Sequence, residues 1–318
     1  MRDAESLSRL LRERHFGVAT GLVEPPDEAL AVWERRLAGS PRTWGAAVAE
    51  LQFDLREALR DEHVRILGAA RRRDGRVEEE EPGPAVEETV VAGVLVVRVR
   101  RLIGDPADET QLARWRAAAD RHFSYDRIVV DLRANPGGND GHTFEWAQRR
   151  FRAVRRHVRE SLWAVRGRPL GNWNAFAWRA ASDATAVPPH LVAGRHDPLP
   201  DDRIELHRAE HPLEAGDRPW NGEMLVLVDR RTRSSGESSA WLLRDGLGAR
   251  LVGSPTTGMI EYGNIVPYVL PESGLVIQLP TKHNDYGFTV ESVGFPVDVS
   301  LADDAPAAEI AAEFESFL

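Results

Sequence analysis

The spacing of hydrophobic positions along the chain changes once, near residue 90. In residues 1–68 leucines recur three and four positions apart, as at Leu7, Leu10 and Leu11, which is the spacing of one helix face. From Val90 onward the apolar residues form short, β-branched runs, which are typical of buried strands. The pattern therefore predicts a helical N-terminal part followed by a part that contains strands.

Strands and helices are expected to alternate in the second part. Apolar runs predict strands at about 90–102, 126–133, 222–229, 250–253, 264–270 and 275–279. A return to helical spacing predicts helices at about 107–121 and 142–160, one after residue 234, and one at the C-terminus. Strands that alternate with helices indicate an α/β fold.

Charged and aromatic stretches suggest how the chain divides. Residues 70–88 are highly charged and contain Pro and Gly, so they are interpreted as a linker or an exposed hairpin. We expect an N-terminal helical subdomain at 1–68, this charged linker or hairpin at 69–89, and an α/β core at 90–318. A Trp-rich insertion at 161–221 lacks periodicity, and long irregular segments in enzymes are often lids or binding loops. A packed satellite subdomain is the alternative.

Composition removes several classes of function. The chain of 318 residues carries 41 basic and 50 acidic side chains, and its scattered arginines do not form the basic face that nucleic acids require. It has no cysteine, which excludes thiolate zinc sites, disulfides and cysteine nucleophiles. No signal peptide is visible, and no apolar run is long enough to span a bilayer. We expect a cytoplasmic protein with neither nucleic-acid nor membrane partners.

A glycine turn ends the predicted strand at 126–133. The sequence there is Asn135-Pro136-Gly137-Gly138. Glycines permit backbone angles closed to other residues and leave their N–H groups unscreened, and a helix N-terminus that follows attracts negative charge. The turn could supply one half of an oxyanion hole, with a phosphate-binding turn or a plain tight turn as alternatives.

A serine turn ends the predicted strand at 222–229. Ser234 and Ser235 lie where this strand leads into a helix, a position suited to nucleophilic attack, and the next backbone N–H can face an oxyanion. The alternative is that one of these serines only caps the helix. Two such turns on neighbouring strands can converge over one scissile carbonyl.

Four motifs in this order resemble the C-terminal-processing (tail-specific) serine peptidases. They are DLRANPGG, TRSSGE, LVGSPTTG and ESVGFPVDV, and the resemblance covers about residues 50–300. It implies a catalytic core of the ClpP/crotonase type. It also implies Ser234 as the nucleophile, with Ser235 and either Gly137 or Gly138 as donors to the oxyanion.

Lysine usage distinguishes the two branches of that family. In one branch a catalytic lysine directly follows the T-x-G motif, but here Met259 follows Thr256-Thr257-Gly258. Lys282 is the one lysine of the chain and is interpreted as a solvated surface residue. The sequence therefore resembles the other branch, which includes the tricorn core and the repeat modules of interphotoreceptor retinoid-binding protein.

The resemblance to that branch implies a histidine base. Residues 59–63, LRDEH, resemble its L-x-D-x-H signature, which implies His63 as the base. Glu291 matches the late acidic residue that completes the set and orients the histidine. Glu62 stands where tricorn-like members carry a serine, which makes it an accessory candidate, and Pro296-Val297-Asp298 replaces the usual Pro-Asp ending.

Three other polar residues compete for roles on chemical grounds. Glu261 is a rival acid, and His283 lies in a polar segment as a rival base. Glu237 lies in the first turn of the helix after Ser234, so we expect it to cap that helix rather than to catalyse.

These residues predict a serine endopeptidase that acts on a peptide or protein. A neutral histidine can take the serine proton near pH 7, and a carboxylate then stabilises the charged imidazole. No metal or organic cofactor is implied. Two alternatives remain: a catalytically silent binder of ligands or peptides on the same fold, and a peptide acyl-transferase or cyclase.

The chain leaves no room for a PDZ module. Many lysine-branch members carry one between their helical part and the first core strand, but here that gap is a short charged segment. Substrate selection is therefore expected to lie in residues 161–221 and in the N-terminal helices. Assembly into a homo-oligomer is left open.

Overall fold

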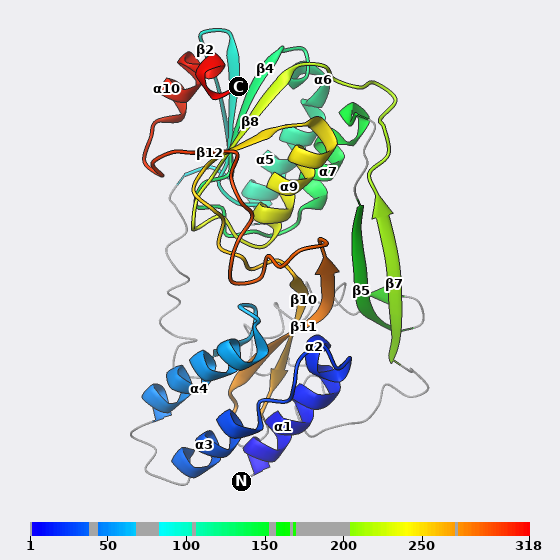
Figure 1. The fold of residues 1–318 in the computed structure, drawn as a ribbon, viewed down its shortest axis with the longest axis vertical. Coiled ribbons are helices and arrows are strands. Elements are labelled where there is room, and N and C mark those ends of the chain that lie inside the picture. Colours follow the sequence, from blue (N-terminus) through cyan, green and yellow to red (C-terminus); the bar gives the residue numbers. More distant parts are fainter. Residues whose placement is uncertain are drawn as a thin grey trace. The chain divides into compact units, whose positions relative to one another are not determined.

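The computed structural model groups the chain into two compact units (Figure 1). Unit 1 contains residues 1–77, 159–209 and 261–285, and unit 2 contains residues 78–158, 210–260 and 286–318. Among the described residues, no helix has the length and apolar content that crossing a bilayer requires. The residues that the structure describes are 2–37, 44–67, 83–103, 106–152, 157–165, 168–169, 204–270 and 273–318.

Unit 2 is built on a six-stranded sheet in the order β12-β9-β8-β4-β3-β2. Its strands are β2 (Val86–Val91), β3 (Val94–Val99), β4 (Arg127–Asp131), β8 (Glu223–Val228), β9 (Arg250–Gly253) and β12 (Val299–Ser300). All neighbours are parallel except the β2–β3 hairpin. At the centre, Val129 pairs with Val96 on one side and Leu225 on the other. The continuous apolar runs of the sequence form this sheet because helices cover both of its faces.

Helices pack on both faces of the unit 2 sheet (Figure 1). The larger core holds Trp115, Trp146 and Leu243, and the smaller core holds Ile310 and Phe314. This arrangement confirms the α/β class predicted from the sequence. One face carries α5 (Pro106–Ala117), α6 (Ala119–His122), α7 (Gly141–Ala147), the short helix η3 (Gln148–Arg150) and α9 (Ser235–Leu247). The other face carries α10 (Ala307–Ala312) and the short helix η6 (Phe314–Phe317).

Unit 1 combines helices with an antiparallel sheet. The helices are α1 (Arg2–Arg14), α2 (Phe16–Ala19), α3 (Asp27–Leu37) and α4 (Trp44–Leu59). The strands are β1 (Arg65–Leu67), β5 (His157–Val165), β6 (Arg168–Pro169), β7 (Ile204–Pro212), β10 (Tyr262–Val269) and β11 (Val276–Asp285). Strand β11 is the central one and pairs antiparallel with β1, β10 and β5. The predicted helix face of Leu7, Leu10 and Leu11 is buried in one core with Ile277 and Leu279.

The two units are assembled from alternating stretches of sequence. Residues 261–285 belong with the N-terminal helices, so the N-terminal part is not helical alone. Strand β2 begins at Val86, inside the segment interpreted as a linker or hairpin. Residues 69–82 of that segment lie outside the described residues, as does most of the Trp-rich insertion at 161–221, including Trp173 and Trp178.

Candidate active site

Ser234 lies in the turn between β8 and α9 and has an unusual backbone conformation. Its φ is 52° and its ψ is −124°, a region that side chains with a Cβ rarely adopt. A residue held there costs about 1–3 kcal/mol, which the surrounding structure must offset, and such residues cluster at functional sites. The strand–turn–helix geometry is that of a nucleophile elbow, which exposes a serine at the end of a sheet.

The Glu237 carboxylate holds the Ser234 turn in place. It is fully buried, and Oε2 accepts the N–H groups of Ser234 at 2.9 Å and Met259 at 2.8 Å. Oε1 accepts the N–H of Gly258 at 2.8 Å and the hydroxyl of Thr256 at 2.6 Å. Burial raises the pKa of Glu237, and these donors act in the opposite direction. Glu237 therefore caps the helix, as expected, and also fastens the loop at 256–259 to it.

The glycine turn after β4 reaches the serine turn. Gly137 has a φ of 100°, and a Cβ built on it would lie 2.8 Å from the Cβ of Ser234 and 3.0 Å from the backbone N of Ser235. Only a residue without a side chain allows this approach. A hydrogen bond of 2.9 Å from the Ser235 hydroxyl to the carbonyl of Gly138 also joins the two turns. The two motifs that the sequence singles out are therefore neighbours within unit 2.

The backbone donors of the two turns differ in what they contact. The N–H of Gly137 donates to Oδ1 of Asn135 at 2.8 Å, and Asn135 in turn donates to the carbonyl of Val99 at 2.8 Å. Within the part of the chain that the structure describes, the N–H groups of Gly138 and Ser235 have no acceptor. Two donors next to Ser234 therefore remain available to a ligand.

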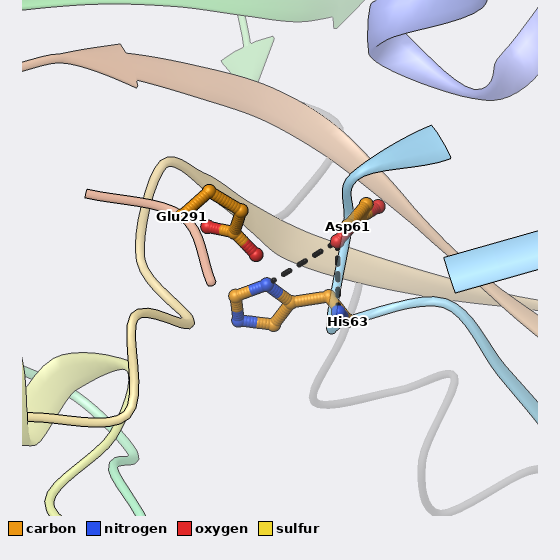
Figure 2. A group of neighbouring side chains, drawn as sticks. All are labelled: Asp61, His63 and Glu291. Atoms are coloured by element: carbon orange, nitrogen blue, oxygen red, sulfur yellow. Dashed lines mark hydrogen bonds and ion pairs between the residues drawn. The ribbon is translucent and has the colours of Figure 1, made fainter. Parts of the chain in front are cut away.

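His63 follows the end of α4 in unit 1 and contacts Asp61 (Figure 2). Both side chains are buried. Oδ1 of Asp61 accepts the His63 N–H at 2.8 Å and lies 3.6 Å from Nδ1 of the ring. Oδ2 of Asp61 lies 3.0 Å from Nε2 of the buried His15. Burial alone would raise the pKa of Asp61, but the hydrogen bonds of His15 and His63 lower it to about 2.

Glu291 lies in unit 2, in the tight turn that follows Val290. The residue is 5% exposed, and Oε2 accepts the N–H of Ile260 at 3.0 Å. The next residue, Ser292, has a φ of 60°, and the carbonyl of Val290 accepts the N–H groups of two later residues. This turn gives Glu291 a fixed, buried position in the same unit as Ser234.

The accessory candidates have structural partners. Glu62 forms an ion pair of 3.4 Å with Arg56, and the backbone carbonyl of Glu261 accepts the N–H of Asn284 at 2.6 Å. Lys282 pairs with Glu160 at 3.0 Å, with only 21% of its side chain exposed. The interpretation of Lys282 as a solvated surface residue is therefore wrong, because its strand β11 places it against β5.

His283, the rival base, is packed among aromatic rings. Its ring stacks on Phe16 at 6.3 Å and lies 5.2 Å from the ring of Tyr262. Burial lowers its pKa, while the nearby Glu261, Asp285 and Asp61 act to raise it.

The predicted site residues are divided between the units. Ser234, Ser235, Gly137, Gly138 and Glu291 belong to unit 2, whereas His63, Glu62 and Glu261 belong to unit 1. Among the described residues of either unit taken by itself, no three His, Asp or Glu side chains converge as a metal site requires. Sequence reasoning assigned no role to His15 or Asp61, although the L-x-D-x-H signature contains Asp61.

Comparisons with known proteins concern the sequence family and the fold of the chain. The sequence model of peptidase family S41 matches residues 96–286, which is more than half of the chain. A lipoprotein from Streptococcus agalactiae has a similar structure, with a TM-score of 0.59 and 12% identity. A candidate peptidase from Parabacteroides merdae is also similar, with a TM-score of 0.57 and 13% identity. Each match covers 100% of this chain and 96% of the solved chain. At these identities the similarity shows a shared fold. No curated protein matches the sequence.

Proposed function

The chain belongs to peptidase family S41, and on that premise we propose that it is a serine endopeptidase with Ser234 as its nucleophile. The observation that supports this assignment is the strained backbone of Ser234. A serine that only caps a helix has ordinary extended backbone angles. The strain is what a nucleophile at a strand-to-helix turn requires, because it turns the hydroxyl outward.

The oxyanion hole is formed by the N–H groups of Gly138 and Ser235. The sequence left Gly137 and Gly138 as alternatives, and the hydrogen bond from Gly137 to Asn135 favours Gly138. Gly137 has a structural role instead, because the absence of a side chain leaves space for Ser234. Preorganised backbone donors stabilise the negative charge of the tetrahedral intermediate, and losing one donor typically costs about 3–4 kcal/mol.

His63 acts as the general base and Glu291 as the acid that completes the set. Support for these roles comes from the family's motifs, from the burial of both side chains and from the anionic Asp61 beside His63. His63 takes the proton of the Ser234 hydroxyl as the serine attacks the peptide carbonyl. It then gives this proton to the leaving amine, which yields an acyl-enzyme that water hydrolyses by the same proton transfers in reverse order.

The two alternatives from the sequence are less well supported. In a catalytically silent binder, the cost of a strained serine beside two unpaired backbone donors would serve no function. Acyl transfer shares every step up to the acyl-enzyme, so it differs from hydrolysis only in whether an amine or water attacks. No feature of the described residues favours the amine.

The decisive experiment is turnover of a pool of unfolded peptides, read by mass spectrometry. We expect new fragments whose summed masses exceed the parent by one water. Ser234→Ala should abolish them, whereas Ser124→Ala, at an exposed serine whose hydroxyl donates to the carbonyl of Arg121, should not. Fragments joined to an amine instead of water would show a transferase. Intact peptides with the wild-type protein would contradict the proposal.

Several features expected from the sequence stay predictions. Substrate selection by residues 161–221 concerns positions that lie largely outside the described residues. Three other expectations also stay predictions: the cytoplasmic location, the absence of nucleic-acid and membrane partners, and the oligomeric state. Cell fractionation and light scattering test the location and the oligomeric state.

A further inference from the structure

A buried carboxylate in unit 1 lies between two histidines from distant parts of the sequence. His15 comes from the turn that begins α2, whereas Asp61 and His63 come from the segment that follows α4. All three side chains are buried from solvent. A charged group in such a place is costly unless its polar atoms are satisfied. Asp61 meets this condition, since Oδ1 accepts the His63 N–H and Oδ2 contacts His15.

The hydrogen bonds of His15 determine where its proton lies. Its Nδ1 accepts the backbone N–H of Val18 at 3.2 Å, so this nitrogen carries no proton. Nε2 then carries the proton and donates it to Oδ2 of Asp61 at 3.0 Å. His15 is therefore a neutral donor that replaces water around the carboxylate, and it leaves the negative charge of Asp61 uncompensated.

We propose that Asp61, held by His15, is the positioning carboxylate of the catalytic base His63. Asp61 fixes the backbone of His63 through one short hydrogen bond and places a negative charge 3.6 Å from Nδ1 of the ring. That charge stabilises the imidazolium that forms when His63 takes the serine proton. His15 acts one step further away, because it keeps Asp61 ionised and correctly turned. The role rests on the proposed function, in which His63 is the base.

Four other titratable groups of unit 1 near this cluster come from β10, β11 and their ends. Tyr262 has its ring 5.7 Å from that of His15, and His283 lies beyond it. Glu261 and Asp285 act on His283, as Asp61 does. Substitutions at positions 15 and 61 leave these four groups in place, so an altered titration of His63 reports on the cluster itself.

Two pairs of variants separate positioning from structural support. His15→Leu removes the donor to Asp61, whereas His15→Gln keeps an amide N–H that can take its place. Asp61→Asn removes the charge, whereas Asp27→Asn removes an exposed carboxylate of the same unit that pairs with Arg12. Circular dichroism and thermal melting first establish which variants are folded.

The readouts are the pH dependence of fluorophosphonate labelling at Ser234 and the NMR titration of His63. We expect His15→Leu and Asp61→Asn to lower the labelling rate at pH 7 at least tenfold. Asp61→Asn should also move the titration midpoint of His63 to lower pH by about one unit, the usual effect of removing an adjacent opposite charge. His15→Leu, which frees the Asp61 carboxylate to turn away from the ring, should move it in the same direction. His15→Gln should restore most of the rate, and Asp27→Asn should resemble wild type.

A measurement on the wild-type protein covers the case in which the variants do not fold. Nitrogen shifts of His15 should show a protonated Nε2 and an unprotonated Nδ1 throughout the neutral pH range. A protonated Nδ1 would overturn the proposal.

Failure of the positioning role differs from failure of the proposed function. Labelling of Ser234 in wild type, together with an unchanged His63 titration in folded His15→Leu and Asp61→Asn, overturns the positioning role alone. A wild-type protein that is not labelled overturns the proposed function and the catalytic part of the cluster with it.

Discussion

Replacing Gly137 with alanine tests the convergence of the two turns. The added Cβ would lie 2.8 Å from the Cβ of Ser234, 3.0 Å from the N of Ser235 and 3.1 Å from the carbonyl of Arg233. Cβ atoms do not tolerate such approaches, and two of the three neighbours are backbone atoms that cannot rotate away. The turn must therefore move, or unit 2 must lose stability.

The magnitude of this effect has two parts. A positive φ, here 100°, costs an alanine about 1–3 kcal/mol. Overpacking of a close contact costs about 1–3 kcal/mol more. A shift of about 1 Å at a nucleophile lowers reactivity roughly 100-fold. We expect Gly137→Ala to be less stable by about 2–6 kcal/mol, the sum of the two costs, and to label at least 100-fold more slowly.

Gly93→Ala is the matched control. Gly93 belongs to the same unit, has a φ of 80°, and has nothing within 4 Å of a built Cβ. It carries the conformational cost without the contact, so we expect a loss of about 1–3 kcal/mol and wild-type labelling. Urea unfolding and fluorophosphonate labelling measure both variants. If Gly137→Ala matched Gly93→Ala in both assays, the described contact between the turns would be refuted.

Three further predictions concern residues around the site. Lys282→Met should leave the labelling rate unchanged and cost less than about 1 kcal/mol, as a partly exposed ion pair does; a lost rate would contradict a histidine base. Asn135→Ala should lower stability by about 1–3 kcal/mol in urea unfolding and slow labelling, because the N–H of Gly137 and the carbonyl of Val99 lose their partner; wild-type behaviour in both would argue against this support. In the folded protein the pKa of Asp61 is about 2, below its usual value of 3.8. It therefore contributes about 2 kcal/mol of stability above pH 4, which is lost as the pH falls towards 2. The stability difference between wild type and Asp61→Asn should shrink over that window in urea unfolding; a constant difference would contradict it.

Local sequence patterns predicted the core of unit 2 well. The apolar runs at 126–133 and 222–229 became β4 and β8, because a strand covered on both faces needs apolar residues at every position. The polar turns after these strands were identifiable for a similar reason, since glycine and serine there serve backbone needs that few residues meet.

The same patterns failed where the outcome depends on distant partners. The helix expected at 142–160 ends as α7 and η3 at Arg150, and the chain is in strand β5 from His157. Phe151 packs against Gly246, which has no side chain to obstruct the ring. Nothing in the local pattern indicates this contact. The apolar faces of the N-terminal helices likewise do not reveal that β10 and β11 will cover them.

The candidate site also combines residues that local sequence patterns predicted with residues that depend on distant partners. The sequence left Gly137 and Gly138 as equal candidates, and the side chain of Asn135 distinguishes them in the structure. His15 carries no signal in the sequence, because its partner Asp61 lies 46 residues away and the contact forms only on folding. The sequence motif identified His63, whereas the groups that surround it became known only from the structure.

The central claim is that Ser234 is an activated nucleophile with His63 as its base. The most direct test is fluorophosphonate treatment followed by peptide mapping of wild type, Ser234→Ala and His63→Gln. We predict one adduct on Ser234 in wild type, no adduct in Ser234→Ala, and labelling at least 100-fold slower in a folded His63→Gln. An adduct on another serine, or equal labelling of wild type and His63→Gln, would contradict the account.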